Sequence, residues 1–294
     1  MIEPFTLPFM GRALIEIGLL ALICGPVSVF VYARRLAFVS DALTHTVFPG
    51  VVIGFVAGGL EGLFVGALVA ALLTAVVLTL LTRGNRVSDD AATAVVLTAM
   101  FSVGVVLVSR RTSYTADLTA FLFGRLLTVT PRQIAETAVV AVVVLVALLI
   151  GARALLFRTF DPAGAAAAGF RVGWLDLWLN IVVALVVVAA VRAVGTILVV
   201  ALLIVPAAAA RMVTDKLVAM AVVGTVLIVG AGYAGLLASW TASLRYGVAL
   251  TSASSVVLLL VAAYLLLIPV RLLRTRRPGV PPAPERNSAH ELVG

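Results

Sequence analysis

The stretch Ser40-Asp41-Ala42-Leu43-Thr44-His45-Thr46-Val47-Phe48-Pro49-Gly50 places an acid and an imidazole inside a run of otherwise apolar character. Asp41 and His45 are four residues apart, so on a helix their side chains lie on one face, one turn apart. Ionisable side chains at membrane depth usually face a bundle interior or a water-filled path. Carboxylate and imidazole are also ligands that divalent transition metals accept. The stretch therefore predicts a metal path, provided that the rest of the chain spans a membrane.

The composition of the 294-residue chain is that of an integral membrane protein. Hydrophobic residues make up 63% of it, charged residues only 12%, and the mean hydropathy is +1.22. A soluble domain is typically about 45–50% apolar and about 25% charged. So much apolar surface does not fit into one aqueous core. We therefore predict a multi-pass protein of the cell membrane.

The apolar residues fall into segments long enough to cross a bilayer, which takes about 20 residues. Nine candidates are approximately 13–32, 42–58, 62–82, 91–109, 133–156, 174–192, 194–212, 217–238 and 248–270. An alternative with eight spans makes one segment re-entrant. The predicted fold class is all-α, a polytopic transmembrane helical bundle of eight or nine spans over residues 1–274. The Pro-rich, polar residues 275–294 are expected to be a disordered cytoplasmic tail.

The net charge of +8 comes from short basic clusters between the apolar segments, not from a basic face on a polar domain. This distribution is typical of topology-setting charges and argues against a nucleic-acid partner. It places the N-terminus outside and the C-terminus inside the cell. Arg110, Arg111 and Arg192 fall on the outer side, against the rule. The clusters on the cytoplasmic side are Arg34/Arg35, Arg83/Arg86, Arg153/Arg158, Arg211/Lys216 and the arginines from Arg271 to Arg277.

Two connecting regions carry helix-start signals. Residues 110–132 are polar, and the short apolar piece at 118–128 is too short to cross, which favours an interfacial or re-entrant helix. Thr130 and Pro131 then form the N-cap and first position of the next span. Residues 157–173 form the largest cytoplasmic loop, in which Asp161 caps a short helix, Pro162 starts it and Gly169 ends it. That helix is either a docking element for another protein or a plain connector.

Pro206 lies in the middle of an apolar segment and is followed by Ala207 to Ala210. A proline at this position frees a backbone carbonyl and kinks a helix, and small residues let another helix approach closely. The segment is either a gate or hinge, or a site of tight packing.

Several chemistries are excluded by the residues that the chain lacks. Its one cysteine, Cys24, allows neither an intrachain disulfide nor a cysteine-based metal site. No HExxH motif occurs, and the only lysine, Lys216, does not follow a glycine, so a Walker A loop is absent. We expect no enzyme activity in this chain. If transport is driven by ATP, the ATPase is a separate subunit.

Two interpretations of the Asp41/His45 pair remain open. In one, Ser40 or Asp41 caps the start of a helix and His45 is a buried, hydrogen-bonded side chain. In the other, the pair supplies one oxygen and one nitrogen ligand to a transported ion, which suits Mn, Fe or Zn. Two side chains do not complete a coordination shell, so Thr44, water or carbonyls exposed near Pro49 would add to it. Such a weak, transient site is what a conduction path needs.

Four stretches in order resemble the metal-ion ABC transporter permeases, the zinc/manganese/iron group sometimes called the ABC-3 family. The first, RRLAFVSDALTHTVFPGVVIGF, resembles the family signature SDALSHAVLPG, with Thr44 in place of the usual serine. The others are ADLTAFLFGRLLTV (116–129), FDPAGAAAAGF (160–170) and VGTILVVALLIVPAAAARMVTD (194–215). The resemblance covers roughly residues 10–270. A departure lies at 239–250, where Arg245-Tyr246-Gly247 lacks the proline of the family's usual turn.

The resemblance implies a homodimer of permease chains, a cytoplasmic dimer of ABC ATPases and an extracytoplasmic metal-binding protein that delivers the ion. It implies that Asp41 and His45 line or bind the metal path and that residues 160–170 contact the ATPase. No cofactor is held permanently; the metal is cargo, and the sequence does not select Zn, Mn or Fe. The alternatives are a gradient-driven metal transporter, for which Glu16 is the only further candidate coupling acid, and an intramembrane enzyme that uses Asp41 and His45.

Overall fold

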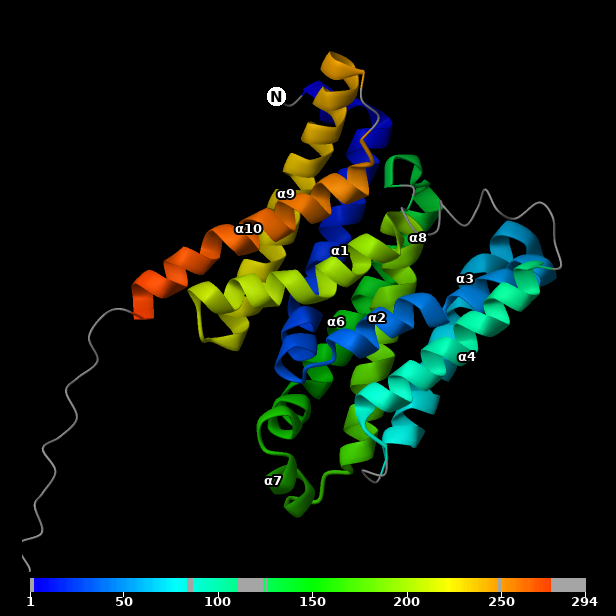
Figure 1. Ribbon diagram of the computed structural model, residues 1–294, viewed down its shortest axis with the longest axis vertical. Coiled ribbons are helices and arrows are strands. Elements are labelled where there is room, and N and C mark those ends of the chain that lie inside the picture. The colour runs from blue at the N-terminus through cyan, green and yellow to red at the C-terminus, as the bar shows by residue number, and fades with distance from the viewer. Residues whose placement is uncertain (1–2, 84–86, 110–123, 125, 248–249, 276–294) are drawn as a thin grey trace, which may run out of the picture.

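The computed structural model describes residues 3–83, 87–109, 124, 126–247 and 250–275 (Figure 1). Every regular element in these residues is a helix, which confirms the all-α prediction. Of the predicted tail, only Thr275 lies within the described residues. In chain order the elements are η1 (Glu3–Thr6), α1 (Pro8–Ala33), α2 (Ala37–Thr46), α3 (Phe48–Thr82), α4 (Asp89–Ser109), η2 (Leu126–Thr128), α6 (Pro131–Phe160), α7 (Pro162–Ala167), α8 (Val172–Val213), α9 (Leu217–Tyr246) and α10 (Ser252–Thr275).

Within the described ranges, eight helical stretches are long and apolar enough to cross a membrane. The sixth and seventh predicted segments both lie in α8, which has 42 residues. At a rise of 1.5 Å per residue, α8 is about 63 Å long, twice the thickness of the hydrocarbon layer. Its backbone breaks at Gly195 (φ +79°, ψ +164°). Figure 1 shows the consequence, because the second half of α8 turns away from the direction of the first.

The helix α3 is a hairpin of two apolar arms. Its backbone reverses at Gly59, whose φ of +61° favours glycine. The first arm continues α2 as one interrupted span, Ala37–Gly59, and the second arm is the span Glu61–Thr82. Both agree with the predicted segments at 42–58 and 62–82. The arms touch through four glycines at which a Cβ would collide with the opposite backbone, Gly50 against Gly66 and Gly54 against Gly62.

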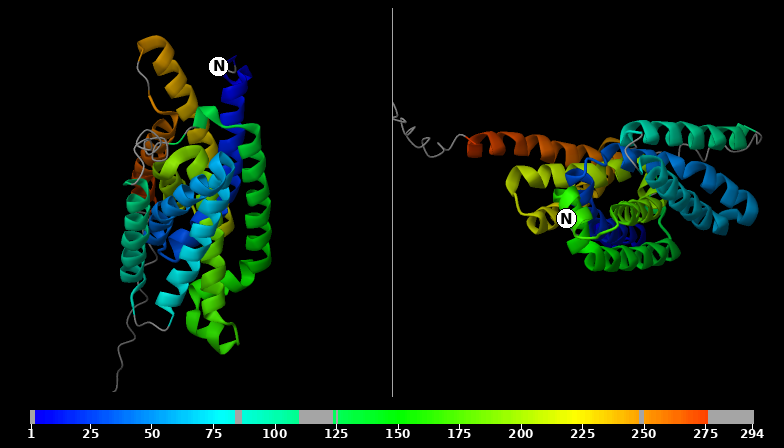
Figure 2. Two further views of the ribbon diagram at one scale, coloured as in Figure 1. Left: turned by 90° about the vertical axis from the view of Figure 1, so that its right-hand side faces the viewer. Right: turned by 90° about the horizontal axis from the view of Figure 1, so that it is seen from below.

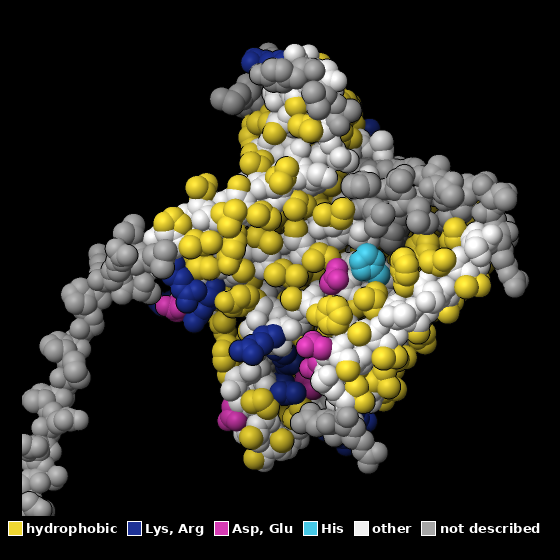
Figure 3. Space-filling model, viewed as in Figure 1, with side chains coloured by type: hydrophobic (Ala, Val, Ile, Leu, Met, Phe, Trp, Pro, Cys, Tyr) yellow, Lys and Arg dark blue, Asp and Glu magenta, His cyan; other side chains and the backbone are white. Residues whose placement is uncertain are grey.

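The core of the bundle is built around α1 and α8. The first of these packs on α6, α8 and α9, while α3 and α4 lie side by side at one flank of the molecule (Figures 1 and 2). The outward faces carry large apolar side chains, such as Leu149 (78% exposed) and Leu266 (73% exposed). Figure 3 shows how widely such side chains cover one face. In a membrane protein these side chains meet lipid, and the backbone polar groups are satisfied within the helices.

The predicted start of the fifth span is confirmed. Thr130 caps α6, and its Oγ1 accepts a hydrogen bond from the Gln133 N–H (3.3 Å) while Gln133 Oε1 accepts one from the Thr130 N–H (2.9 Å). This is a capping box with Pro131 at the first helical position. Of the helix predicted at 118–128, only Gly124 and η2 (Leu126–Thr128) belong to the described residues; the rest lies outside them.

Candidate functional site

Asp41 and His45 lie one turn apart on α2, as their spacing predicts. The distance from His45 Nε2 to Asp41 Oδ1 is 3.8 Å, too long for a hydrogen bond. The side chain of Asp41 is 40% exposed and that of His45 is 33% exposed. The pair is therefore open to the surroundings and has unused ligand capacity.

The capping interpretation of this stretch is wrong. Helix α2 begins at Ala37, with Leu36 at the N-cap, so Asp41 lies inside the helix. The hydroxyl of Ser40 donates to the carbonyl of Leu36 within the helix (3.0 Å), as buried serines in helices commonly do. His45 is also not a buried, hydrogen-bonded side chain, because a third of it is exposed. The apolar segment at 42–58 suggests a helix start here, but the helix begins earlier, at Ala37.

A helix break directly follows the pair. Helix α2 ends at Thr46, Val47 forms a turn, and α3 begins at Phe48 with Pro49 in its first turn. Pro49 has no N–H, so it cannot make the helical hydrogen bond to the carbonyl of His45. That carbonyl accepts the N–H of Val47 instead. The break therefore leaves a backbone oxygen outside the regular helical ladder, next to the imidazole.

Thr44 does not share the open face of the pair. It is fully buried, and its Oγ1 donates to the carbonyl of Asp41 (2.7 Å). Its hydroxyl thus holds the backbone of α2 and is not directed at the two exposed ligands.

The surroundings of the pair are aromatic and apolar. The His45 ring packs against Phe101 of α4 in a T-shaped arrangement, with ring centroids 6.3 Å apart and an interplanar angle of 88°. The centroid of the Phe48 ring lies 6.2 Å from that of Phe101. Figure 3 shows a histidine side chain beside an acidic one on a face that is otherwise largely apolar. Among the described residues, no three His, Cys, Asp or Glu side chains form a metal-sized group. At this position the described part of one chain thus offers two such ligands, Asp41 and His45, which is half of a coordination shell.

The predicted cytoplasmic element has the expected local structure. Asp161 caps α7, and its Oδ1 accepts the N–H of Gly164 (2.7 Å); Pro162 is the first helical residue. Gly169 follows the helix at φ +86°. The N–H groups of Gly169 and Phe170 bond to the carbonyls of Ala166 and Ala165, which is a Schellman end.

An ion cluster that the sequence did not reveal lies beside α7. Arg34, after α1, donates to Asp176 of α8 (2.7 Å) and to Thr159 of α6 (2.9 Å), and Arg158 also contacts Asp176 (3.1 Å). Burial lowers the pKa of Arg34, and the Asp176 carboxylate opposes that shift. The cluster shows that Arg34 and Arg158 lie at the same end of the bundle, as the charge distribution predicts. No local sequence pattern marks the long-range partners of Asp176.

Pro206 does not mark the bend in α8. The helix continues through this residue to Val213, and the break lies at Gly195. Pro206 is buried, and Gly224 of α9 packs directly against it. Ala207 and Ala210 are fully buried as well. The tight-packing interpretation describes this stretch, because the neighbouring helices hold the proline turn in place.

A sequence model of the ABC 3 transport family matches residues 6–270. The chain belongs to the ABC 3 transport family. It is 34% identical over 212 residues to the manganese transport system membrane protein MntC of Halalkalibacterium halodurans, covering 72% of each chain. It is 32% identical over 238 residues to the chelated iron transport system membrane protein YfeD of Yersinia pestis, covering 81% of this chain and 79% of the relative.

The fold matches a solved structure over most of the chain. The structure of PsaBC from Streptococcus pneumoniae in complex with Fab aligns with a TM-score of 0.77 and 30% identity, over 91% of this chain and 95% of that chain. The predicted family and fold class are thus confirmed. The chain is a multi-pass cell-membrane protein and a transport component, and nothing in these relatives supports a gradient-driven transporter.

Proposed function

We propose that this chain is the permease of an importer that carries a divalent transition metal ion into the cell, driven by separate cytoplasmic ATPase subunits. The relatives named for manganese and chelated iron support this cargo class. The observation that carries the proposal is the open Asp41/His45 pair, a carboxylate and an imidazole at membrane depth. Manganese and iron both accept this combination of ligands, and so does zinc.

A homodimer would complete the metal site. A two-fold axis places the same surface patch of both chains face to face. If the open face of α2 lies at that axis, two Asp41/His45 pairs meet and supply two oxygens and two nitrogens. The carbonyl of His45, outside the helical ladder because of Pro49, adds a weaker oxygen from each chain. Such a site assembles and opens as the two chains move, which suits transient binding of a passing ion.

The cytoplasmic end provides a surface for the ATPase. Helix α7 is largely exposed, and the flanking Phe160 and Phe170 are 65% and 43% exposed. The Arg34–Asp176–Arg158 cluster joins the ends of α1, α6 and α8 beside this helix. Movement of α7 on ATP binding would therefore pull on three spans together. Pro206 remains a candidate gating residue through its packing on α9. An extracytoplasmic metal-binding protein would deliver the ion and set most of the metal selectivity.

Metal uptake in cells that lack other importers tests the path. We expect Asp41→Ala and His45→Ala each to reduce uptake at least about tenfold, because even the loss of a residue that only supports a ligand costs 10–100-fold. Asp90→Ala, which removes an exposed acid at the start of α4, is the matched control and should import normally. Uptake at the unmutated rate by both variants, at normal protein levels, would show that the pair is not on the path.

A further inference from the structure

A second acid lies inside the bundle, away from the Asp41/His45 pair. Glu16 of α1 is completely buried. Its Oε1 accepts a hydrogen bond from Thr137 Oγ1 of α6 (2.7 Å). Its Oε2 is buried as well and forms no hydrogen bond with any described residue. A buried polar atom without a partner is rare in native structures and calls for an unseen ligand.

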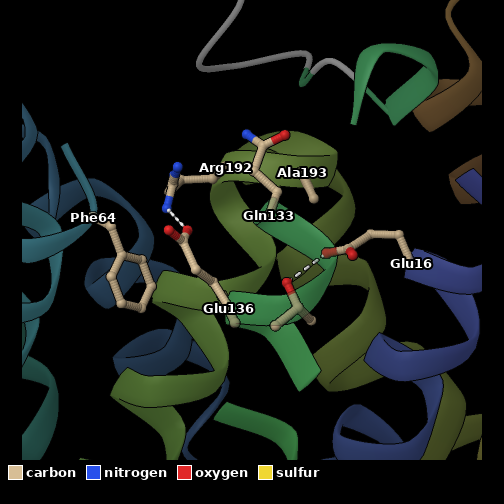
Figure 4. Close-up of a pocket in the computed structure, with 8 residues that line it drawn as sticks. Glu16, Phe64, Gln133, Glu136, Arg192 and Ala193 are labelled. Carbon is tan, nitrogen blue, oxygen red and sulfur yellow. Dashed lines mark hydrogen bonds and ion pairs between the residues drawn. The ribbon is translucent and has the colours of Figure 1, made fainter. Parts of the chain in front are cut away.

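The acid borders a small pocket (Figure 4). The pocket has a volume of about 10 Å³, which is room for about one water molecule. It lies between helices α1, α3, α6 and α8, and its other lining side chains are Phe64, Gln133, Glu136, Thr137, Ala189, Arg192 and Ala193.

The charged neighbours of the pocket are already paired with one another. Glu136 binds Arg192 through Oε2 (2.7 Å) and Arg132 through Oε1 (3.2 Å), and Arg132 also binds Glu61 (2.8 Å). Figure 4 shows the Arg192–Glu136 pair on one side of the pocket and Glu16 on the other. The lining includes no ionisable side chain from α9. Within the described residues, Glu16 has no ion-pair partner.

On α1 itself, the nearest charge to Glu16 in sequence is Arg12, one turn earlier. Its Nε donates to the carbonyl of Pro8 (3.0 Å), at an exposed position. It therefore does not neutralise the buried carboxyl.

An ionised Glu16 would be a buried charge inside a membrane bundle, which is costly, and the one cation in the pocket lining, Arg192, is already paired with Glu136. A metal ion or a proton would neutralise it. A metal ion needs several oxygen ligands, but those of the pocket are occupied. Both oxygens of Glu136 face arginines, and Gln133 Oε1 accepts the N–H (2.9 Å) and the hydroxyl (3.3 Å) of Thr130. Arg192 in the lining would also repel a cation. A proton bonds covalently to a single oxygen, so it leaves the carboxyl neutral without a coordination shell and needs only the free Oε2.

We propose that Glu16 is a protonation site of the bundle. At neutral pH the proton is bound to Oε2, and this O–H group donates a hydrogen bond to one water molecule in the pocket. The Thr137 hydroxyl donates to the other oxygen, so each carboxyl oxygen has one role. Release of the proton would place a negative charge on Glu16, near Arg192. This charge would attract the Arg192 guanidinium away from Glu136. Arg192 lies three residues before Gly195, where α8 bends. The proton thus favours the Arg192–Glu136 ion pair seen here.

Infrared spectroscopy of the purified full-length protein, in a detergent that has no ester or other carbonyl group, tests the proposal directly. A protonated carboxyl has a carbonyl stretching band that ionised carboxylates lack. At pH 7 we expect this band in the unmutated protein and its loss in Glu16→Gln. The matched control is Glu136→Gln, the same substitution on the adjacent, arginine-paired acid, which should keep the band. These measurements need no transport, so their outcome is independent of the metal-path assignment.

Three results would overturn the proposal. The first is the absence of any protonated-carboxyl band in the unmutated protein at pH 7, which decides the matter even if Glu16→Gln does not fold. The second is a band that is equal in Glu16→Gln and in the unmutated protein. The third is a melting temperature that rises with Na⁺ or K⁺, relative to N-methylglucamine at equal ionic strength, in the unmutated protein and not in Glu16→Gln; that result would identify a metal ion in the pocket.

Discussion

Two acid–base pairs in this protein, Arg34–Asp176 and Asp41–His45, differ in whether their hydrogen-bonding capacity is used. Arg34 is only 10% exposed and contacts Asp176 at 2.7 Å, with Thr159 and Arg158 completing the cluster. Asp41 and His45 are 3.8 Å apart and more than 30% exposed. We call the first pair closed, because its charged groups are bonded to each other and are largely buried; it holds three helices together. We call the second pair open, because its groups are exposed and not bonded to each other, which is the property expected of residues that bind a passing ligand.

The largest effect on stability should follow from Arg34→Ala. The substitution leaves Asp176 with one arginine and removes the hydrogen bond to Thr159. Breaking a buried pair costs about 3–5 kcal/mol; because Asp176 is 29% exposed, we expect about 2–3 kcal/mol. Thermal unfolding of the purified protein measures the loss. Arg34→Lys, which keeps the charge, should lose less, and equal losses in the two variants would show that the charge is not what matters.

Metal binding at Asp41 and His45 should stabilise the folded protein, and the Arg34–Asp176 pair should take no part in it. A ligand present at ten times its Kd stabilises the folded protein by about 1.4 kcal/mol. We expect Mn²⁺ to raise the melting temperature of the unmutated protein, the chelator EDTA to reverse the rise, and Asp41→Ala to abolish it. Mg²⁺ prefers an all-oxygen shell and serves as the control ion. Equal stabilisation by Mn²⁺ in Asp41→Ala would place the metal elsewhere.

The Asp161 cap of α7 is intermediate between the two pairs, because its hydrogen bond is formed but lies at an exposed position. The Asp161 cap of α7 should contribute about 1 kcal/mol to that helix. Asp161→Ala should therefore unfold α7 locally, which hydrogen exchange of the amides of residues 163–167 would detect. Asp161→Asn keeps a capping oxygen and should restore protection. If α7 contacts the ATPase, Asp161→Ala should also weaken binding of that subunit, and unchanged binding would contradict the coupling role.

The smallest stability effect is expected for Asp41→Ala without metal. Asp41 forms no hydrogen bond through its carboxylate among the described contacts and lies inside α2, where alanine is the best helix former. The free energy of unfolding should change by no more than about 0.5 kcal/mol. Thermal unfolding in EDTA is the measurement. A loss as large as that of Arg34→Ala would mean that the pair is structural and that the contrast between open and closed pairs fails.

Features set within one or two helical turns were predicted well. Thr130 and Pro131 start α6, and Asp161, Pro162 and Gly169 bound α7, because capping depends on residues at most a few positions apart. Asp41 and His45 share a face for the same reason. Whether Pro206 bends its helix was left open by the sequence, because neighbouring helices decide whether a proline bends a helix; α8 continues through Pro206, which packs against Gly224. In α8 the bend falls at Gly195, where a positive φ costs glycine little.

The sequence by itself determined that this chain spans a membrane, where most spans lie, and which acid and imidazole share one face of a helix. These properties follow from composition, the length of apolar runs and the 3.6-residue period of the helix. Only the tertiary structure decided which polar groups are closed. Arg34 and Asp176 are 142 positions apart, and Glu16 and Thr137 are 121 apart. Helix packing creates such contacts, and no local pattern encodes them. That packing brings Arg34 and Asp176 into an ion pair that joins helices, and it leaves one oxygen of Glu16 without a hydrogen bond. It also leaves Asp41 and His45 exposed and able to bind an ion.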